Sequence, residues 1–244
     1  MRPTVVLLHG FTQTRHSWRR TVAALGGRYR ALTPDLPGHG SAAARTASFH
    51  ACSAYVRALA GARVTLAGYS MGGRIALHAA LALREHVERL VLIGASPGIE
   101  DPAERAERRE ADLALAERIE AIGVEAFAEE WGAQPLFAGQ EASVAAAAHA
   151  DRLRNTAPGL AAALRGLGTG AMEPLWSRLG ELALPVTLVV GERDGRFRAI
   201  AERMAQRLPD ARLIVVPGAG HAVPLESPEA TAHQLGSPSS SDSA

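Results

Sequence analysis

Six short apolar segments, separated by stretches with helical periodicity, constrain the fold of this chain more than any other feature. They are residues 4–8, 29–33, 64–67, 90–93, 186–190 and 213–216. Each segment is apolar nearly throughout, as strands buried on both faces of a parallel sheet are. Helices are expected between them at residues 18–25, 49–60, 71–83, 200–208 and 229–235. This alternation predicts an α/β protein with a mostly parallel open sheet and helices on both faces.

One long stretch of the chain interrupts the alternation. Between about residues 99 and 172 the composition shifts to Ala, Glu and Arg, and only helical patterns are found. We expect a helical cap at residues 99–172, inserted into a core made of residues 1–98 and 173–235. The low-complexity end, residues 236–244, is predicted to be disordered. A length of 244 residues suits one such domain with an insertion.

The charge balance and the single cysteine exclude several classes of function. The chain has 26 basic and 25 acidic residues, so no overall field attracts nucleic acid or an anionic membrane. Cys52 rules out an internal disulfide and is expected to be a quiet, half-buried thiol. No metal site or cofactor is expected. The first apolar segment is too short for a signal peptide or membrane span, which predicts a soluble cytoplasmic protein of open oligomeric state.

The segment Gly-Tyr-Ser-Met-Gly at residues 68–72 matches the pattern G-x-S-x-G. An expected strand ends directly before it and an expected helix begins directly after it. A serine on such a sharp strand-to-helix turn needs small neighbours, and the turn exposes its hydroxyl beside the helix N-terminus. Ser70 is therefore the candidate nucleophile, the alternative being a plain glycine turn.

A serine of this kind needs a histidine base and a carboxylate that orients the histidine. Asp194 and His221 each follow an expected strand, in the chain order serine, acid, histidine. Glu192 is the rival acid, and its alternative role is a solvated turn carboxylate. For His221 the alternative is a structural loop histidine. Because ligands bind beyond the carboxyl ends of parallel strands, we expect Ser70, Asp194 and His221 to form a catalytic triad there.

The turn His-Gly-Phe at residues 9–11 closes the first expected strand. Turns of this type supply a second amide for binding an oxyanion, so the predicted oxyanion hole is formed by the backbone N–H groups of Phe11 and Met71. His9 is expected to shape the turn. The loop at residues 35–41 is expected to be architectural.

Two arginines suggest a substrate with negative charge. Arg74 lies four residues after Ser70, one turn along the same helix face, although a surface arginine is the alternative. In the insertion, an apolar stripe of Leu115, Ile119, Ile122 and Ala126 leads back to Asp112 and Arg108. Arg108 either faces a ligand or pairs with Asp112, because an isolated charge on an inward face is costly.

Several motifs together resemble the 2-succinyl-6-hydroxy-2,4-cyclohexadiene-1-carboxylate (SHCHC) synthases of menaquinone biosynthesis, which belong to the α/β-hydrolase superfamily. The motifs are residues 68–74, 94–98, 104–112, 134–137, 153–155 and 191–194, with Trp131, and the likeness extends over about residues 3 to 235. The resemblance implies an α/β-hydrolase fold. It also implies that Tyr69, Arg74, Arg108, Trp131 and Arg154 bind substrate. Arg152 is a near alternative to Arg154. Arg196 stands where family members often have lysine, and its role is left open.

The resemblance further implies a lyase and no acyl-enzyme. It would eliminate pyruvate from 2-succinyl-5-enolpyruvyl-6-hydroxy-3-cyclohexene-1-carboxylate, a small tricarboxylate, with Ser70 as general base. Three arginines would match three carboxylates. A carboxylesterase or thioesterase that transfers an acyl group through Ser70 is the alternative. A binding protein without catalysis is a third possibility, which the complete triad disfavours.

Overall fold

The computed structural model describes residues 2–61 and 63–236, and its centre is a single sheet of six parallel strands. The strands are β1 (Thr4–Leu8), β2 (Arg30–Leu32), β3 (Val64–Tyr69), β4 (Val87–Ile93), β5 (Val186–Gly191) and β6 (Ala211–Val216). Their order in the sheet is β2-β1-β3-β4-β5-β6. All five neighbouring pairs are parallel, as the sequence predicts.

The six expected strands are all present, and no strand end differs from its predicted position by more than three residues. β1 has the predicted bounds, whereas β2 is shorter than predicted. β4 begins at Val87 instead of Leu90, because Val87 pairs with Val64 across a register shift in the sheet. β3 continues to Tyr69, so Ser70 follows the last strand residue directly.

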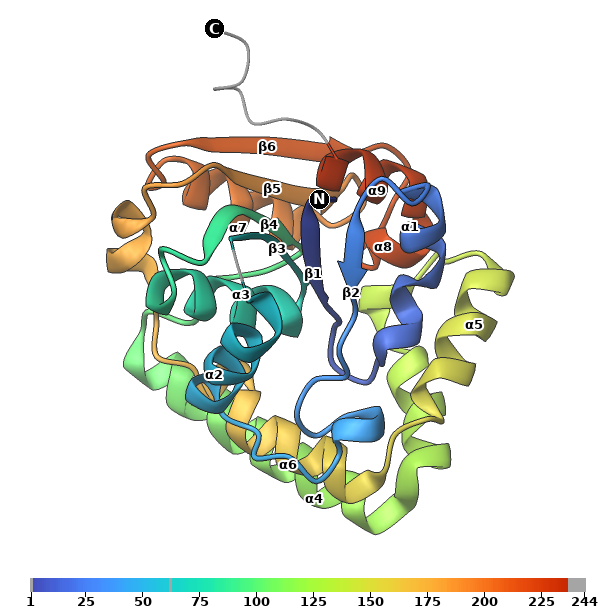
Figure 1. Ribbon diagram of the computed structural model, residues 1–244. Helices are drawn as coiled ribbons and strands as arrows, with labels where there is room; N and C mark the ends of the chain where they lie inside the picture. Colours follow the sequence, from blue (N-terminus) through green and yellow to red (C-terminus); the bar gives the residue numbers. More distant parts are fainter. Residues whose placement is uncertain (1, 62, 237–244) are drawn as a thin grey trace, which may run out of the picture.

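The two faces of the sheet bury two separate apolar cores. Val6 and Leu8 of β1 face a cluster shared with α2 (Phe49–Ala60), α3 (Met71–Ala82) and α7 (Gly195–Ala205). Val5 and Leu7 face the other cluster, which includes Trp18 of the short 3-10 helix η1 (Arg15–Trp18) and Leu235 of α9 (Pro228–Gly236). This alternation follows from the two-residue period of a strand, and it covers both faces with helices (Figure 1).

Two of the expected helices differ from the structure by more than one residue at an end. The segment predicted as one helix at residues 18–25 is the 3-10 helix η1 followed by α1 (Arg19–Ala24). The helix predicted at residues 200–208 begins at Gly195 and ends at Ala205. It begins early because the Asp194 carboxylate accepts the N–H of Phe197 and caps the helix, a signal that apolar periodicity does not contain.

Residues 99–172 contain helices and no strand. They form α4 (Pro102–Gly132), the 3-10 helix η3 (Pro135–Phe137), α5 (Ala142–Arg152), α6 (Ala157–Leu167) and the 3-10 helix η4 (Thr169–Ala171). α4 and α6 pass together across the end of the molecule toward which β1 and β2 point (Figure 1). After this segment come the 3-10 helix η5 (Trp176–Glu181), β5, α7 and β6, and α8 (Val223–Glu226) lies between β6 and α9.

The predicted apolar stripe on α4 is wrong at its last position. Ile119 is buried, but Ala126 is exposed. Gly123 has non-helical backbone angles (φ 81°, ψ 171°), and this kink changes the face that points inward. Beyond it, Phe127 and Ala128 are the buried residues, and Phe127 joins Ile119 in a third apolar cluster with α6.

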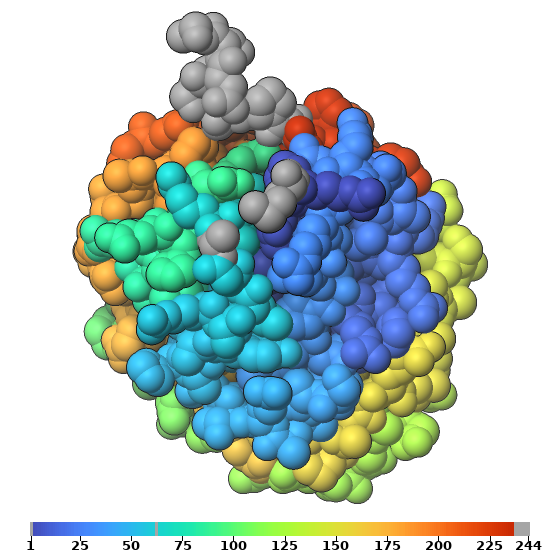
Figure 2. Space-filling model, in the orientation of Figure 1, coloured from blue at the N-terminus to red at the C-terminus, as the bar shows by residue number. Residues whose placement is uncertain are grey.

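Two buried polar side chains attach the helical segment to the loops that follow β1 and β2. Asp151 accepts hydrogen bonds from the amide and hydroxyl of Thr14, at 2.9 and 2.5 Å. Asn155 accepts from the Gly40 amide at 3.0 Å and donates to the Thr12 carbonyl at 2.7 Å. In Figure 2, the yellow residues of the helical segment lie beside the blue N-terminal residues, and α5 contacts η1.

Three further expectations concern Cys52, the end of the chain and the membrane. Cys52 is fully buried rather than half-buried. Gly236, which we expected in a disordered tail, is the last residue of α9, and residues 237–244 lie outside the described part of the chain. Of the helices in the described ranges, none is both long and apolar enough to cross a bilayer.

Candidate active site

Ser70 occupies a tight turn between β3 and α3. Its backbone has φ 52° and ψ −111°, a conformation that costs a non-glycine residue on the order of 1–3 kcal/mol. The turn is possible because its neighbours are glycines: a Cβ on Gly68 would lie 2.2 Å from the Gly72 carbonyl oxygen, and one on Gly72 would lie 2.2 Å from the Leu8 oxygen. The G-x-S-x-G spacing is therefore a steric requirement of the turn that presents Ser70.

His221 connects Ser70 to Asp194. Its Nδ1 lies 2.6 Å from Oδ2 of Asp194, and its Nε2 lies 3.2 Å from Oγ of Ser70. Because the carboxylate only accepts hydrogen bonds, Nδ1 carries the proton and Nε2 is free to accept the serine proton. The rival acid Glu192 is exposed and instead accepts the Gly218 amide at 2.8 Å. This geometry is that of a serine, its base and the orienting acid.

The two amides expected to bind an oxyanion have no competing acceptor. Met71 is the first residue of α3, where an N–H has no partner within the helix. Neither the Phe11 nor the Met71 amide has a hydrogen-bond partner among the described residues. Both residues line the cavity of Ser70, and two unpartnered amides there, one at a helix N-terminus, can hold a negatively charged oxygen.

The turn that carries Phe11 is held by histidines that stay neutral. The Leu36 amide donates to Nε2 of His9 at 2.9 Å, and Nδ1 of His9 donates to the Gly10 carbonyl at 2.9 Å. The Thr12 amide donates to His39. Burial lowers the pKa of His9 and lowers that of His39 to about 3, so both rings act as fixed acceptors. His9 thus shapes the turn, as expected, and does not contact Ser70.

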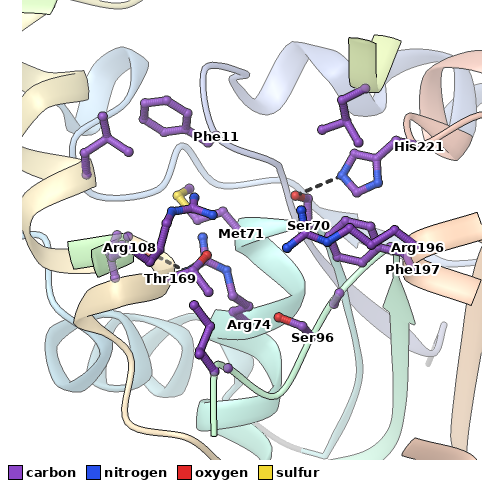
Figure 3. A pocket seen from close by; sticks show the side chains of 18 of the residues that line it. Phe11, Ser70, Met71, Arg74, Ser96, Arg108, Thr169, Arg196, Phe197 and His221 are labelled. Atoms are coloured by element: carbon purple, nitrogen blue, oxygen red, sulfur yellow. Dashed lines mark hydrogen bonds between the residues drawn. The ribbon is translucent and has the colours of Figure 1, made fainter. Parts of the chain in front are cut away.

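Ser70 and His221 open into a cavity of about 310 Å³ between the carboxyl ends of the strands and the helical segment. Figure 3 shows Arg74 and Arg108 reaching it on one side of Ser70 and Arg196 on the other. The main apolar residues that line it are Phe11, Met71, Leu115, Trp131, Leu167, Phe197 and Ile200. A serine paired with a histidine in a largely apolar cavity with three arginines suits an anionic organic substrate.

Arg74 and Arg108 raise the positive charge on one side of this cavity. Burial and the nearby charge of Arg108 lower the pKa of Arg74 to about 10, while Nη1 of Arg74 donates to the Leu167 carbonyl at 2.7 Å. Arg108 does pair with Asp112, with Nε 2.7 Å from Oδ1, and it also lines the cavity. Asp112 is the carboxylate whose charge acts on both Arg74 and Arg108. An anionic ligand in the cavity would therefore reduce the repulsion between the two guanidinium groups.

Arg196 is the cation that the sequence left open. It lies in the first turn of α7, lines the cavity and extends over the ring of Phe197 at 5.9 Å. No carboxylate pairs with it in the described part of the chain. Arg196 lies two residues after Asp194, which caps α7. This closeness to the acid is the sequence signal that could have identified Arg196 as a residue of the site.

The structure does not bring Arg154 to the cavity of Ser70. Arg154 is half-exposed, lies 3.7 Å from Asp151 and lines a different surface hollow with His16 and Arg19. The nearby Arg152 is buried instead, with its guanidinium over Phe137 at 5.3 Å. The two arginines lie two residues apart where α5 ends, and helical periodicity alone does not distinguish their surroundings.

Buried Arg152 has two features that fit a binding residue. Its Nε has no hydrogen-bond partner among the described residues, although an unpartnered buried donor is costly. A Cβ on Gly132 would lie 3.1 Å from its Nη1, so the guanidinium is close to the end of α4 next to Trp131.

Of the two expected aromatic residues, only Trp131 lines the cavity. It packs against Phe11 with ring centres 5.1 Å apart, and its buried Nε1 has no hydrogen-bond partner in the described ranges. Tyr69 is buried beneath the cavity with its ring 5.3 Å from that of His221. Sequence analysis missed Ser96, Thr169 and Phe197, which also line the cavity. Within the described ranges, no cluster of three or more His, Cys, Asp or Glu could hold a metal ion.

Comparison with known proteins first defines the class. The alpha/beta hydrolase family profile matches residues 5–234. The fold superposes on the structure of MenH from S. aureus with a TM-score of 0.90, at 32% identity over 96% of this chain and 92% of that one. A thermophilic esterase from Thermogutta terrifontis, solved with malate bound, superposes with a TM-score of 0.82, at 26% identity over 96% of this chain and 88% of that one.

Sequence relatives then define the family within this class. A Bacillus subtilis (strain 168) protein assigned as an SHCHC synthase is 39% identical over 92% of this chain and 85% of its own length. The SHCHC synthase of Klebsiella pneumoniae is 34% identical over 93% of this chain and 90% of its own length. The chain therefore belongs to the SHCHC synthase family of the alpha/beta hydrolases.

Proposed function

We propose that this protein eliminates pyruvate from 2-succinyl-5-enolpyruvyl-6-hydroxy-3-cyclohexene-1-carboxylate and releases SHCHC. The observation that carries the proposal is the hydrogen-bonded series Ser70–His221–Asp194 beside a cavity that three arginines line. Relatives that match nearly the whole chain are named for the synthesis of this product. Of the alternatives considered, this reaction best accounts for both the serine base and the cationic lining.

The bonds that change follow from the substrate and the product. The ring changes from a 3-ene to a 2,4-diene, so the proton leaves C2 and the enolpyruvyl oxygen leaves C5. The C2 proton is acidified by the adjacent succinyl carbonyl. We assign Ser70 as the base that removes it, with His221 taking the serine proton and Asp194 orienting the imidazole.

The remaining electrons move through the conjugated system. The pair from the C2–H bond forms C2=C3, the old double bond shifts to C4=C5, and the C5–O bond breaks. The leaving enolate of pyruvate takes a proton, which the imidazolium of His221 can supply. Charge that builds on the succinyl oxygen is held by the amides of Phe11 and Met71, each worth on the order of 10²–10³ in rate for such donors.

The arginines supply the substrate specificity in this proposal. The substrate has three carboxylates, and Arg74, Arg108 and Arg196 line the cavity. Arginine binds a carboxylate through two parallel hydrogen bonds, which fixes orientation as well as charge. Arg152 does not line the cavity, but it replaces Arg154 as the candidate from the end of α5. Its buried Nε and the buried Nε1 of Trp131 both lack hydrogen-bond partners among the described residues.

We further propose that residues 99–172 are a cap over a core of residues 1–98 and 173–235. The cap supplies Arg108 and Trp131 to the cavity, while the core supplies Ser70, Asp194 and His221. The hydrogen bonds of Asp151 and Asn155 hold one end of it to the core. Exclusion of water by such a cap would favour elimination over hydrolysis.

The test is release of pyruvate by the purified protein, measured with lactate dehydrogenase, together with the absorbance of the diene product. We expect both signals from the native protein and neither from Ser70→Ala. The competing function is acyl transfer by a carboxylesterase or thioesterase, which the same triad could perform. Hydrolysis of simple esters without pyruvate release would overturn the lyase proposal in favour of the esterase.

A further inference from the structure

The loop that carries His221 is held by one buried carboxylate. Glu226 is the last residue of α8, and its side chain is only 7% exposed. Its Oε2 accepts the amide of Gly220 at 2.7 Å, and its Oε1 accepts the amide of Ala222 at 3.2 Å. These two amides directly precede and follow His221, so Glu226 fixes the backbone on both sides of the base.

The loop that carries Asp194 is joined to the same carboxylate by Arg193. Nη2 of Arg193 donates to Oε2 of Glu226 at 2.9 Å, and Nε donates to the carbonyl of Gly218 at 3.0 Å. The backbone amide of Arg193 donates to the Ala219 carbonyl at 2.9 Å. The residue beside the acid therefore binds two carbonyl groups of the histidine loop and the carboxylate that holds this loop.

Both members of this pair also contact the helical segment between β4 and β5. Nη1 of Arg193 donates to the carbonyl of Gly139 at 2.9 Å, and Nε2 of Gln140 donates to Oε1 of Glu226 at 3.2 Å. Gly139 has φ 75°, and a Cβ there would lie 2.3 Å from Nη1 of Arg193. An alanine at this position would therefore displace the Arg193 guanidinium.

Arg193 and Glu226 together fix several segments relative to one another. A guanidinium has five donors in a fixed plane, and here its three nitrogens each bind a different segment. Glu226 accepts four hydrogen bonds on two oxygens. Such charge-assisted bonds are about twice as strong as neutral ones, and none of these groups points into the cavity of Ser70.

We propose that Arg193 and Glu226 are positioning residues that hold His221 between Asp194 and Ser70 and tie this alignment to the cap loop at Gly139 and Gln140. The inference rests on the proposed function for its substrate and its cap, but the alignment itself concerns the reactivity of Ser70 with any reagent. With this arrangement, the alignment of the triad depends on the contacts that the cap loop makes with Arg193 and Glu226.

The experiment uses two readouts, one of which does not involve the proposed substrate. The first is the steady-state kinetics of pyruvate release. The second is the rate of sulfonylation of Ser70 by phenylmethanesulfonyl fluoride, followed by intact mass, in which the serine oxygen bonds to sulfur, fluoride leaves and His221 takes the proton. The variants are Arg193→Gln and Glu226→Gln. The control is Arg198→Gln, because among the described residues the side chain of Arg198 forms just an exposed pair with Glu202 on α7.

We expect kcat and the sulfonylation rate to fall together by roughly 10- to 100-fold in the two variants, the loss caused by small misplacement of a catalytic group. KM should change by less than about 3-fold, because neither residue lines the cavity. The control should retain both rates. The two rates of Arg193→Lys should lie between those of Arg193→Gln and those of the control. Lysine keeps a positive charge facing Glu226 but cannot bind three segments at once.

The link to the cap is tested by Gly139→Ala against Gly27→Ala. Both glycines have positive φ, but a Cβ on Gly27 meets nothing within 4 Å, whereas one on Gly139 meets Arg193. We expect only Gly139→Ala to slow sulfonylation. Equal slowing by both variants would overturn the link, because backbone strain alone would then account for it.

The outcomes separate the two proposals. Slower sulfonylation in the variants, with no pyruvate from the native protein, would refute the lyase and support the positioning pair. Sulfonylation at the native rate in Arg193→Gln and Arg193→Lys would overturn the pair, whatever the native protein does with the cyclohexene. If Glu226→Gln does not fold, the two variants of the half-exposed Arg193 decide the question.

Discussion

The carboxylate of Asp194 lies 2.6 Å from Nδ1 of His221 through one oxygen and accepts the Phe197 amide through the other. It therefore orients the imidazole and caps α7 at the same time. Asp194→Asn should lower kcat by about 10⁴-fold, because the amide favours the wrong tautomer of His221. Glu192→Gln, measured in the same pyruvate assay, should stay within a few-fold of native. The reverse ranking would move the acid to Glu192.

Ser70→Ala should remove most of the activity, on the order of 10⁴-fold or more, because members of a triad act as a unit. Folding should be retained, and relief of the φ 52° strain by Ser70→Gly should raise the melting temperature. Calorimetry and the pyruvate assay check both statements. Near-native turnover by the alanine variant would refute the serine mechanism.

Turnover of the cyclohexene substrate should leave Ser70 unmodified. In the proposed reaction the serine oxygen accepts a proton and forms no bond to carbon. Mass spectrometry of the protein, quenched during steady-state turnover, should show only the native mass. Accumulation of a succinyl adduct on Ser70 would favour acyl transfer, as in an esterase.

Arg74→Ala, Arg108→Ala and Arg196→Ala should each lower kcat/KM by roughly 10- to 150-fold, the value of one charge-assisted hydrogen bond of about 1.5–3 kcal/mol. Arg154→Ala is the matched control and should change it little, because Arg154 lies outside the cavity. A small neutral ester, if hydrolysed, should lose no rate in any of them. Equal losses on charged and neutral substrates would make the arginines structural.

The same variants should differ in stability. Arg108→Ala leaves the buried Asp112 without its 2.7 Å partner and should lower the melting temperature. Arg196→Ala removes an exposed side chain that has no paired carboxylate among the described residues. This variant should therefore keep the native melting temperature. Thermal unfolding of both proteins makes this comparison. A larger loss of stability in Arg196→Ala would contradict the placement of the two side chains.

Cys52 should resist alkylation in the folded protein. Burial raises the pKa of its thiol to about 12, so at pH 8 the reactive thiolate is on the order of one part in ten thousand. Iodoacetamide should therefore label it only after unfolding, when the thiol returns to its ordinary range and is exposed. Labelling at equal rates in native buffer and in guanidinium chloride would show that the helix α2 does not bury it.

Much of the site was predictable because it depends on local order along the chain. The alternation of apolar segments identified all six strands, and the glycines around Ser70 marked a turn that only small residues permit. Asp194 and His221 follow strands, and parallel strands end at one edge of a sheet. Proximity of these residues therefore follows from topology, without knowledge of any side-chain contact.

The tertiary structure decided what depends on the direction of side chains. The kink at Gly123 moved the buried face of α4 from Ala126 to Phe127. At the end of α5, Arg152 is buried and Arg154 is exposed, and neither lines the cavity of Ser70. Arg196 became part of the site because Asp194 starts α7 early. Periodicity places a residue on an element, but caps, kinks and long-range contacts between loops determine which side chain reaches Ser70.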